Sequence, residues 1–222
     1  MRFIDKKLVN QPKELIAHKK TSTPAPTYDN FRDKDVLREA LLKEQGFICG
    51  YCMRKIENDS QAMSIEHYRE QCNFPKKDLD FDNMLAVCSG YWNNDTKNTT
   101  CDTKRGSFDK SQQSLTINPF DKNQMAKIQF STTGKISIDD PIMQEDLDEK
   151  LNLNHDILVK NRKKAIALIM QIVEQKFRTK TLTKVFIQQQ IDYYNTPNGE
   201  GQLQTFCQIF IYWLKKQERK AI

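Results

Sequence analysis

The chain has 222 residues and 38% hydrophobic content, which is enough apolar material for a packed core and fits one large domain or two small ones. No apolar run reaches the length of a membrane span and the opening residues lack the hydrophobic stretch of a signal peptide, which argues against a membrane or secreted protein and predicts a cytoplasmic one. The formal charge is +6, but residues 157–222 hold 12 Lys and Arg against 4 Asp and Glu, a basic excess that suits a polyanion such as nucleic acid or, equally, the solvated face of lysine-rich helices.

The first 46 residues predict a short strand, a linker and a helix. The strand is expected within residues 3–9, and the linker follows because the prolines at positions 24 and 26 restrict the residues before them. Apolar residues at positions 36, 37, 40 and 41 keep helical spacing, so we expect a helix from Asp33 to Gln45. An aspartate, either Asp33 or Asp35, is available to cap its start, and Gly46 is placed to end it.

The region after residue 120 predicts a hairpin and then helices. Residues 126–138 contain two short alternating runs joined by a glycine-containing turn, which is typical of a β-hairpin. The acidic residues 139–149 are expected to form a connector. Three helices are expected to follow: after Leu151–Asn154, over 182–194, and along the apolar stripe 203–214. Asn152 or Asn154 is available to cap the first of them.

Four cysteines have the spacing of metal ligands. Cys49 and Cys52 form a CxxC pair, and Cys88 and Cys101 follow far enough along the chain to close a loop around a shared ion. In a reducing compartment such a set indicates metal thiolates, whereas a disulfide scaffold would need an oxidising one. Because structural Zn²⁺ prefers tetrahedral sulfur ligation, we predict a zinc site formed by these four side chains.

The remaining two cysteines have weaker claims to the metal. Cys72 is a rival ligand, since the 12 residues between Cys88 and Cys101 make a wide gap. A zinc bound there would displace the segment just before it, which carries Glu66 and a histidine. Cys207 lies on an apolar helical stripe and is expected in the core.

The motifs around these cysteines resemble those of the HNH nuclease family. In chain order they are the CxxC pair, Glu66-His67-Tyr68, the Asn-x-Leu block that starts at Asn83, and Cys101-Asp102-x-Lys104-Arg105. The Cys-x-Tyr-Cys, Glu-His-Tyr and Asp-Asn-Leu-like blocks are similar to those of the PtuB-like subfamily found in Septu and retron antiphage systems. The hairpin and the Leu-Asn-Leu-Asn segment, followed by a helix with Arg162, extend the resemblance over most of the chain.

The resemblance implies an α+β fold with a zinc-stapled ββα-metal core, flanking α-helices and a small β-hairpin. The segments are expected to be an N-terminal strand and linker (1–32), the nuclease core with its four-cysteine zinc knuckle (33–120), a hairpin and acidic connector (121–150), and a basic helical region (151–222).

The same resemblance assigns roles to three residues: Glu66 binds a catalytic Mg²⁺ or Mn²⁺, His67 acts as general base, and the amide of Asn83 fixes the loop that carries the base. A histidine suits base catalysis at neutral pH because its ordinary pKa is about 6.5, although a lone histidine is more often structural. Adjacent side chains on a regular strand point to opposite faces, so Glu66 and His67 share one site only if the strand twists or ends there.

Asp102 stands where many members of the family carry their last histidine. A carboxylate is a better ligand than imidazole for Mg²⁺, so we expect Glu66 and Asp102 to hold that ion together. If Asp102 points elsewhere, the second ligand would come from Asn94, Asp95 or Asn98. Lys104 and Arg105 are expected either to contact the substrate phosphate or to be solvated.

The predicted activity is hydrolysis of phosphodiester bonds in nucleic acid, with DNA favoured over RNA. The resemblance also implies a role in antiphage defence and an ABC-type ATPase partner, PtuA-like, that controls cutting. Two other interpretations stay open: an RNA- or tRNA-cleaving HNH toxin, and a zinc-knuckle module that binds nucleic acid or protein without catalysis. The sequence does not separate DNA from RNA, because an HNH site contacts phosphates and selectivity depends on the surrounding surface.

Overall fold

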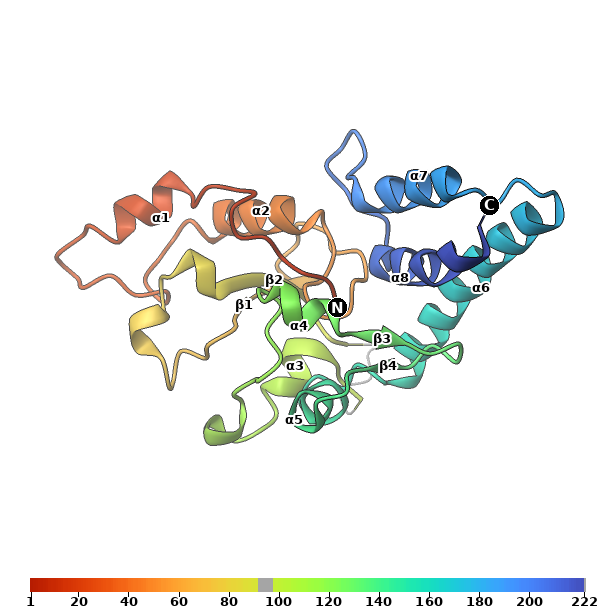
Figure 1. The fold of residues 1–222 in the computed structure, drawn as a ribbon. Coiled ribbons are helices and arrows are strands. Elements are labelled where there is room, and N and C mark those ends of the chain that lie inside the picture. Colours follow the sequence, from red (N-terminus) through yellow and green to blue (C-terminus); the bar gives the residue numbers. More distant parts are fainter. Residues whose placement is uncertain (92–97, 222) are drawn as a thin grey trace.

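A computed structural model describes residues 1–91 and 98–221 as an α+β protein with two small antiparallel sheets among helices (Figure 1). The first sheet lies near the middle of the molecule, and three C-terminal helices pack together on one side (Figure 1). One cluster of buried side chains extends from Met1 to Leu214 and joins these parts. The predicted α+β class is confirmed.

The first sheet and the helix after it form a strand, strand, helix unit. β1 (Met63–His67) and β2 (Met84–Cys88) pair antiparallel, and every residue of β2 is buried. The chain between them contains two short 3-10 turns, η1 (Pro75–Lys77) and η2 (Phe81–Asn83). α3 (Cys101–Arg105) lies beside the strands: the sulfur of Cys101 is near that of Cys88, and the side chain of Arg105 reaches the end of β1.

The N-terminal region differs from its prediction. No strand forms within residues 3–9; instead Met1 and Ile4 are buried, and the Ile4 amide donates to the Pro119 carbonyl at 2.9 Å. The sequence did not predict α1 (Lys13–His18) either. α2 (Lys34–Gln45) confirms the predicted helix, with Asp33 at the N-cap position and Gly46 ending it in the left-handed conformation at φ +62°.

The hairpin is confirmed, with strands shorter than expected. α4 (Lys122–Ala126) precedes β3 (Gln129–Phe130), which pairs antiparallel with β4 (Ile136–Ser137). The acidic connector after it is helical, because α5 (Pro141–Glu145) continues into a π-helical turn, η4 (Asp146–Lys150). Asp140 starts this helix: its carboxylate accepts two backbone amides, and the proline that follows suits the first helical position.

The C-terminal helices are α6 (Asp156–Arg178), α7 (Lys184–Asn195) and α8 (Cys207–Gln217), followed by the 3-10 turn η5 (Glu218–Lys220). α8 packs against both α6 and α7 (Figure 1). His155, rather than Asn152 or Asn154, caps α6, since its Nδ1 accepts the Ile157 amide at 3.2 Å. Within the described part of the chain, no helix combines the length and the apolar character needed to cross a bilayer.

Arg162 joins the hairpin to the helical region. Its side chain is buried, and its guanidinium donates to the carbonyl oxygens of Gly134 and Leu153, both at 2.6 Å. Asn154 adds a second link, because its side-chain oxygen accepts the Ile136 amide at 2.9 Å. These contacts give a structural reason for the Leu-Asn-Leu-Asn segment and the arginine that follows it.

Candidate metal centre and active-site cleft

Four buried cysteine sulfurs form a compact group, which we call the cysteine cluster. The Sγ atoms of Cys49, Cys52, Cys88 and Cys101 all lie within 4.8 Å of one another. Three of the separations are 3.9 Å (Cys49 to Cys101), 3.7 Å (Cys52 to Cys88) and 3.6 Å (Cys88 to Cys101). Four sulfurs placed tetrahedrally at about 2.3 Å from Zn²⁺ would be about 3.8 Å apart. The cluster therefore fits a metal ion such as zinc.

Tight backbone turns shape the cluster. The Cys49 amide donates to the Arg54 carbonyl at 2.9 Å, and the Cys49 carbonyl accepts the Met53 amide at 3.0 Å. The fourth cysteine, Cys101, has a φ of +57°, and its amide donates to the Leu151 carbonyl at 2.9 Å. Burial raises the pKa of the Cys101 thiol well above its ordinary value, so the cluster would need a cation to hold several thiolates.

The other two cysteines lie outside the cluster. Cys72, the rival ligand considered from the sequence, is exposed, and Cys207 is buried at the start of α8. Among the described residues, the cysteine cluster is the one group of three or more cysteine, histidine or acidic side chains arranged to hold a metal.

A cleft of about 520 Å³ opens where β1 ends beside α3. We call it the acidic cleft, because four acidic residues line it: Asp29, Glu66, Glu70 and Asp102. His67 lines it as well, next to Glu66, since β1 ends at this residue and the alternation of faces ends with it. The structure thus brings together Glu66, His67 and Asp102, three residues that the sequence singled out.

Two buried side chains hold the Glu66 carboxylate. The Tyr51 hydroxyl donates to Glu66 Oε1 at 3.0 Å, and Arg105 Nη1 forms a short ion pair with the same oxygen. Tyr51 comes from the CxxC pair and Arg105 from α3, so both arms of the cysteine cluster position this acid. Sequence reasoning missed Tyr51, although its place within the Cys-x-Tyr-Cys motif is a signal that could have identified it.

Arg105 has a different environment from the one expected. Its side chain is 2% exposed, so it is neither solvated nor placed as a surface contact to phosphate. Besides Glu66 it donates to four further acceptors at 2.7–3.1 Å: the carbonyl oxygens of His67, Tyr68 and Gln113, and Glu70 Oε2. Arginine has five N–H donors, and here five acceptors within the protein surround them. Arg105 is therefore a buried clamp on the end of β1.

Glu70 is the second acid on this clamp and was also missed from the sequence. Its Oε1 accepts a hydrogen bond from Asn73 Nδ2 at 2.8 Å and another from the Ser114 hydroxyl. Burial opposes ionisation, but the hydrogen bonds from Ser114 and Asn73, with the charge of Arg105, hold the pKa of Glu70 below its ordinary value. Glu70 therefore acts as a charged partner of Arg105.

Asp102 lines the acidic cleft from the first turn of α3, next to Glu66. Burial and the neighbouring Glu66 carboxylate raise the pKa of Asp102 well above its ordinary value. Two carboxyl groups this close repel each other when ionised, which makes the pair a suitable place for a cation. Of the alternative ligands, Asn98 is exposed and does not line the cleft, and residues Asn94 and Asp95 lie outside the described residues.

His67 is held as a neutral imidazole. Its Nε2 lies 2.9 Å from the carbonyl oxygen of Asp78, which can only accept, so Nε2 carries the proton and Nδ1 keeps its lone pair. The Tyr28 ring packs edge-on against the imidazole, with centroids 4.7 Å apart. Burial lowers the pKa of His67, which keeps the ring uncharged at neutral pH.

Asn83 fixes the loop between β1 and β2. Its Oδ1 accepts the Arg69 amide at 2.8 Å, and its Nδ2 donates to the carbonyl oxygens of Arg69 at 2.9 Å and Lys77 at 3.3 Å. Lys77 directly precedes Asp78, whose carbonyl holds His67. One buried amide thus links the segment after the histidine to Lys77, the neighbour of the residue that orients its ring.

Lys104 does not line the acidic cleft as the structure describes it. It is half-buried on α3, with its Nζ 5.2 Å from the ring centroid of Phe108. The exposed Lys110, in the 3-10 turn η3 (Lys110–Gln112), is the lysine that lines the cleft.

Comparison with known proteins gives one distant relative. No protein-family model matches the chain. The chain is similar to the Septu protein PtuB of Bacillus thuringiensis, with 25% identity over 119 residues, which is 53% of this chain and 42% of that protein. The match thus spans less than half the length of the curated relative. It supports a relation to Septu proteins, while the likeness to HNH nucleases continues to rest on the motifs.

Proposed function

We propose that this protein is a metal-dependent HNH endonuclease that hydrolyses phosphodiester bonds, with DNA as the favoured substrate, and that residues 33–120 form its nuclease core. The observation that carries the proposal is the convergence of a neutral, anchored histidine and a close pair of acids in one cleft. This cleft lies at the end of a strand, strand, helix unit that the cysteine cluster fastens.

His67 is the general base. Its Nε2–H is held by the Asp78 carbonyl, so Nδ1 is the nitrogen that removes a proton from the attacking water. The lowered pKa keeps the imidazole in its basic form at neutral pH. Asn83 contributes by holding the loop that carries the Asp78 carbonyl.

Glu66 and Asp102 are the ligands of the catalytic cation. When bound, Mg²⁺ or Mn²⁺ supplies charge stabilisation for the leaving 3′-oxygen and the pentavalent phosphorus. Tyr51 and Arg105 orient Glu66 by holding its Oε1 atom. Lys104, which lies on α3 outside the acidic cleft, is proposed to contact a substrate phosphate beyond the cleft, and Arg105 is reassigned from that role to positioning.

Zinc in the cysteine cluster is structural. Cys101 directly precedes Asp102, and Tyr51 lies between Cys49 and Cys52, so a metal that fixes the four sulfurs also fixes two side chains that touch Glu66. The metal would hold the two arms in register without contacting substrate.

The likeness to PtuB motivates the biological part of the proposal. We infer that the protein is the effector nuclease of an antiphage defence system and that an ABC-type ATPase of the PtuA kind restrains or releases cutting. A cytoplasmic location would follow from that role.

The test is cleavage of supercoiled plasmid and of total RNA by purified protein in Mg²⁺ or Mn²⁺, with and without any co-encoded ATPase. The chain has three histidines, which supply matched controls: His67→Ala should abolish cutting, while His18→Ala and His155→Ala should not. A sample in EDTA should be inactive and recover on addition of Mg²⁺, with zinc content measured throughout. Cutting of RNA alone would favour an RNA-cleaving toxin. Equal behaviour of wild type and His67→Ala with the partner present would leave a binding module.

A further inference from the structure

A second cavity, which shares no lining residue with the acidic cleft, collects positive charge. It measures about 720 Å³ and lies between the N-terminal residues, α4 and α8. Five of its lining residues are cationic: Arg2, Lys122, Lys215, Lys216 and Arg219. None of its lining residues is acidic. We call it the basic groove.

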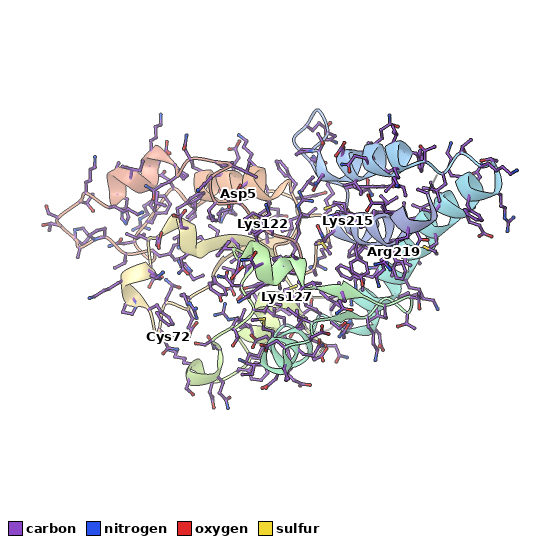
Figure 2. The ribbon with its side chains drawn as sticks, in the orientation of Figure 1. Asp5, Cys72, Lys122, Lys127, Lys215 and Arg219 are labelled. Carbon is purple, nitrogen blue, oxygen red and sulfur yellow. The ribbon has the colours of Figure 1, made fainter. Side chains whose placement is uncertain are left out.

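The cations of the basic groove come from separate parts of the chain. Figure 2 shows Lys122 of α4 in the same part of the molecule as Lys215 of α8 and Arg219 of η5, whereas Cys72, which lines the acidic cleft, lies apart from them. The helix dipole favours cations in the last turn of a helix, and this effect would account for Lys215 and Lys216 of α8. The dipole of α8 does not account for Lys122, which comes from another helix.

Four of the five cations are exposed: Lys122, Lys215, Lys216 and Arg219. The fifth, Arg2, is half-buried and donates to the Cys207 sulfur at 3.5 Å. In the described part of the chain none of the five forms an ion pair with a carboxylate. Lys216 lies over the Tyr212 ring, with Nζ 4.6 Å from the centroid. Tyr212 and Phe3 also line the groove, so aromatic surface accompanies the charge.

The two cavities have opposite character. The four carboxyl groups of the acidic cleft outnumber its two cations, Arg105 and Lys110, so its formal charge is −2, whereas that of the basic groove is +5. A phosphate backbone would therefore gain little attraction from the cleft, even with a divalent cation bound there. Affinity for a polyanion has to come from elsewhere on the surface, and phosphate contacts by Lys and Arg are the usual source.

We propose that the basic groove binds the sugar-phosphate backbone of nucleic acid and supplies the affinity that the acidic cleft lacks. This inference rests on the proposed function, since it assigns the substrate of the same enzyme to a second surface. The half-buried ring of Phe3 offers stacking surface for unpaired bases, as in other grooves that hold single strands.

The test measures binding apart from chemistry. Full-length protein carrying His67→Ala, without added divalent cation, is titrated into fluorescent single-stranded and duplex DNA of about 20 nucleotides over a salt series. The groove variant combines Lys215→Gln, Lys216→Gln and Arg219→Gln. The matched control combines Lys160→Gln, Lys163→Gln and Lys164→Gln, which removes the same charge from exposed positions on α6 outside the groove. A single Lys122→Gln variant tests the opposite wall.

The groove variant should bind at least about 10-fold more weakly at low salt. The slope of its log binding constant against log salt concentration should be shallower by about 2, because each lost phosphate contact removes about 0.7 to 0.9 of this slope. The control should stay within about threefold of the parent, and Lys122→Gln should weaken binding by a smaller factor. Equal losses in the groove variant and the control would overturn the proposal, as would unchanged binding in both. Equally tight, groove-dependent binding of polyglutamate would also overturn it, because the groove would then be a general polyanion or acidic-protein site.

This outcome is separate from that of the proposed function. If plasmid is cut in a His67-dependent way but the groove variant binds normally, only the groove assignment fails. If the groove variant loses binding and no cutting is found in any sample, the groove stands and the nuclease proposal fails.

Discussion

Arg105→Lys tests whether this side chain is a buried clamp. Lysine keeps the charge but has three N–H donors where arginine has five, so at least two of the five acceptors around Arg105 lose their partner. Each buried acceptor left unpaired costs about 1–3 kcal/mol, so the loss of two partners costs about 2–6 kcal/mol. We therefore expect the free energy of unfolding to fall by about 2–6 kcal/mol, which for a chain of this size lowers the Tm by about 4–24 °C.

The assay is thermal unfolding of zinc-replete protein followed by circular dichroism. Lys104→Gln, one residue earlier on α3, is the control and should shift the free energy of unfolding by no more than about 0.5 kcal/mol. If Arg105→Lys unfolds at the same temperature as wild type while its binding to nucleic acid weakens, the clamp is refuted and the phosphate contact expected from the sequence is restored.

Three further predictions concern the cysteine cluster, a buried ion pair and a turn. Elemental analysis should find zinc in the wild type and in Cys72→Ser but not in Cys88→Ser, which should also unfold at a lower temperature because the metal contributes to folding. Equal zinc in Cys88→Ser and wild type would contradict the site. Lys6→Met removes the ammonium 2.6 Å from Glu44, whose pKa burial raises to about 7. A raised folded-state pKa means that the native state favours protonated Glu44, so the contribution of Glu44 to stability declines as the pH rises through about 4.5 to 7. The Lys6→Met variant should therefore lose more stability at about pH 8 than at about pH 5.5. A loss independent of pH would argue against this pair. Gly134→Ala would place a Cβ 2.3 Å from the Val159 carbonyl oxygen at φ +90°, so the free energy of unfolding should fall by more than about 1 kcal/mol. The control Gly199→Ala, whose Cβ would have nothing within 4 Å, should be neutral. Equal unfolding midpoints of the two variants would show that the hairpin turn can relax.

Local sequence patterns predicted local structure well: α2 follows from apolar spacing and from Gly46. The cysteine cluster was also predicted, although it joins segments 52 residues apart (Cys49 to Cys101), because metal ligands are recognised by residue type and number. The predicted N-terminal strand is absent, and Met1 and Ile4 are buried against the core instead. A short alternating run of apolar residues does not distinguish an irregular segment packed on the core from a strand paired in a sheet.

The site was harder to predict where tertiary contacts decide it. Arg105 looks like an exposed charge beside Lys104, and only the fold reveals five acceptors converging on it. Glu66 and His67 share a cleft because β1 stops at His67, and the end of a strand is among the least certain features of a sequence pattern. The basic excess of residues 157–222 was visible from composition, but composition did not show that Lys122 lines the same groove as the cations of that region.

The measurement that tests the proposed mechanism most directly is single-turnover cleavage of plasmid DNA over a Mn²⁺ titration, for wild type, His67→Ala, Glu66→Gln and Asp102→Asn. We predict that Glu66→Gln and Asp102→Asn need much higher Mn²⁺ for any residual cutting. His67→Ala should lose cutting by about 100-fold or more without a change in the Mn²⁺ it requires, since removing a general base typically costs that much. Cutting by His67→Ala at the wild-type rate, with the same Mn²⁺ dependence, would contradict the mechanism.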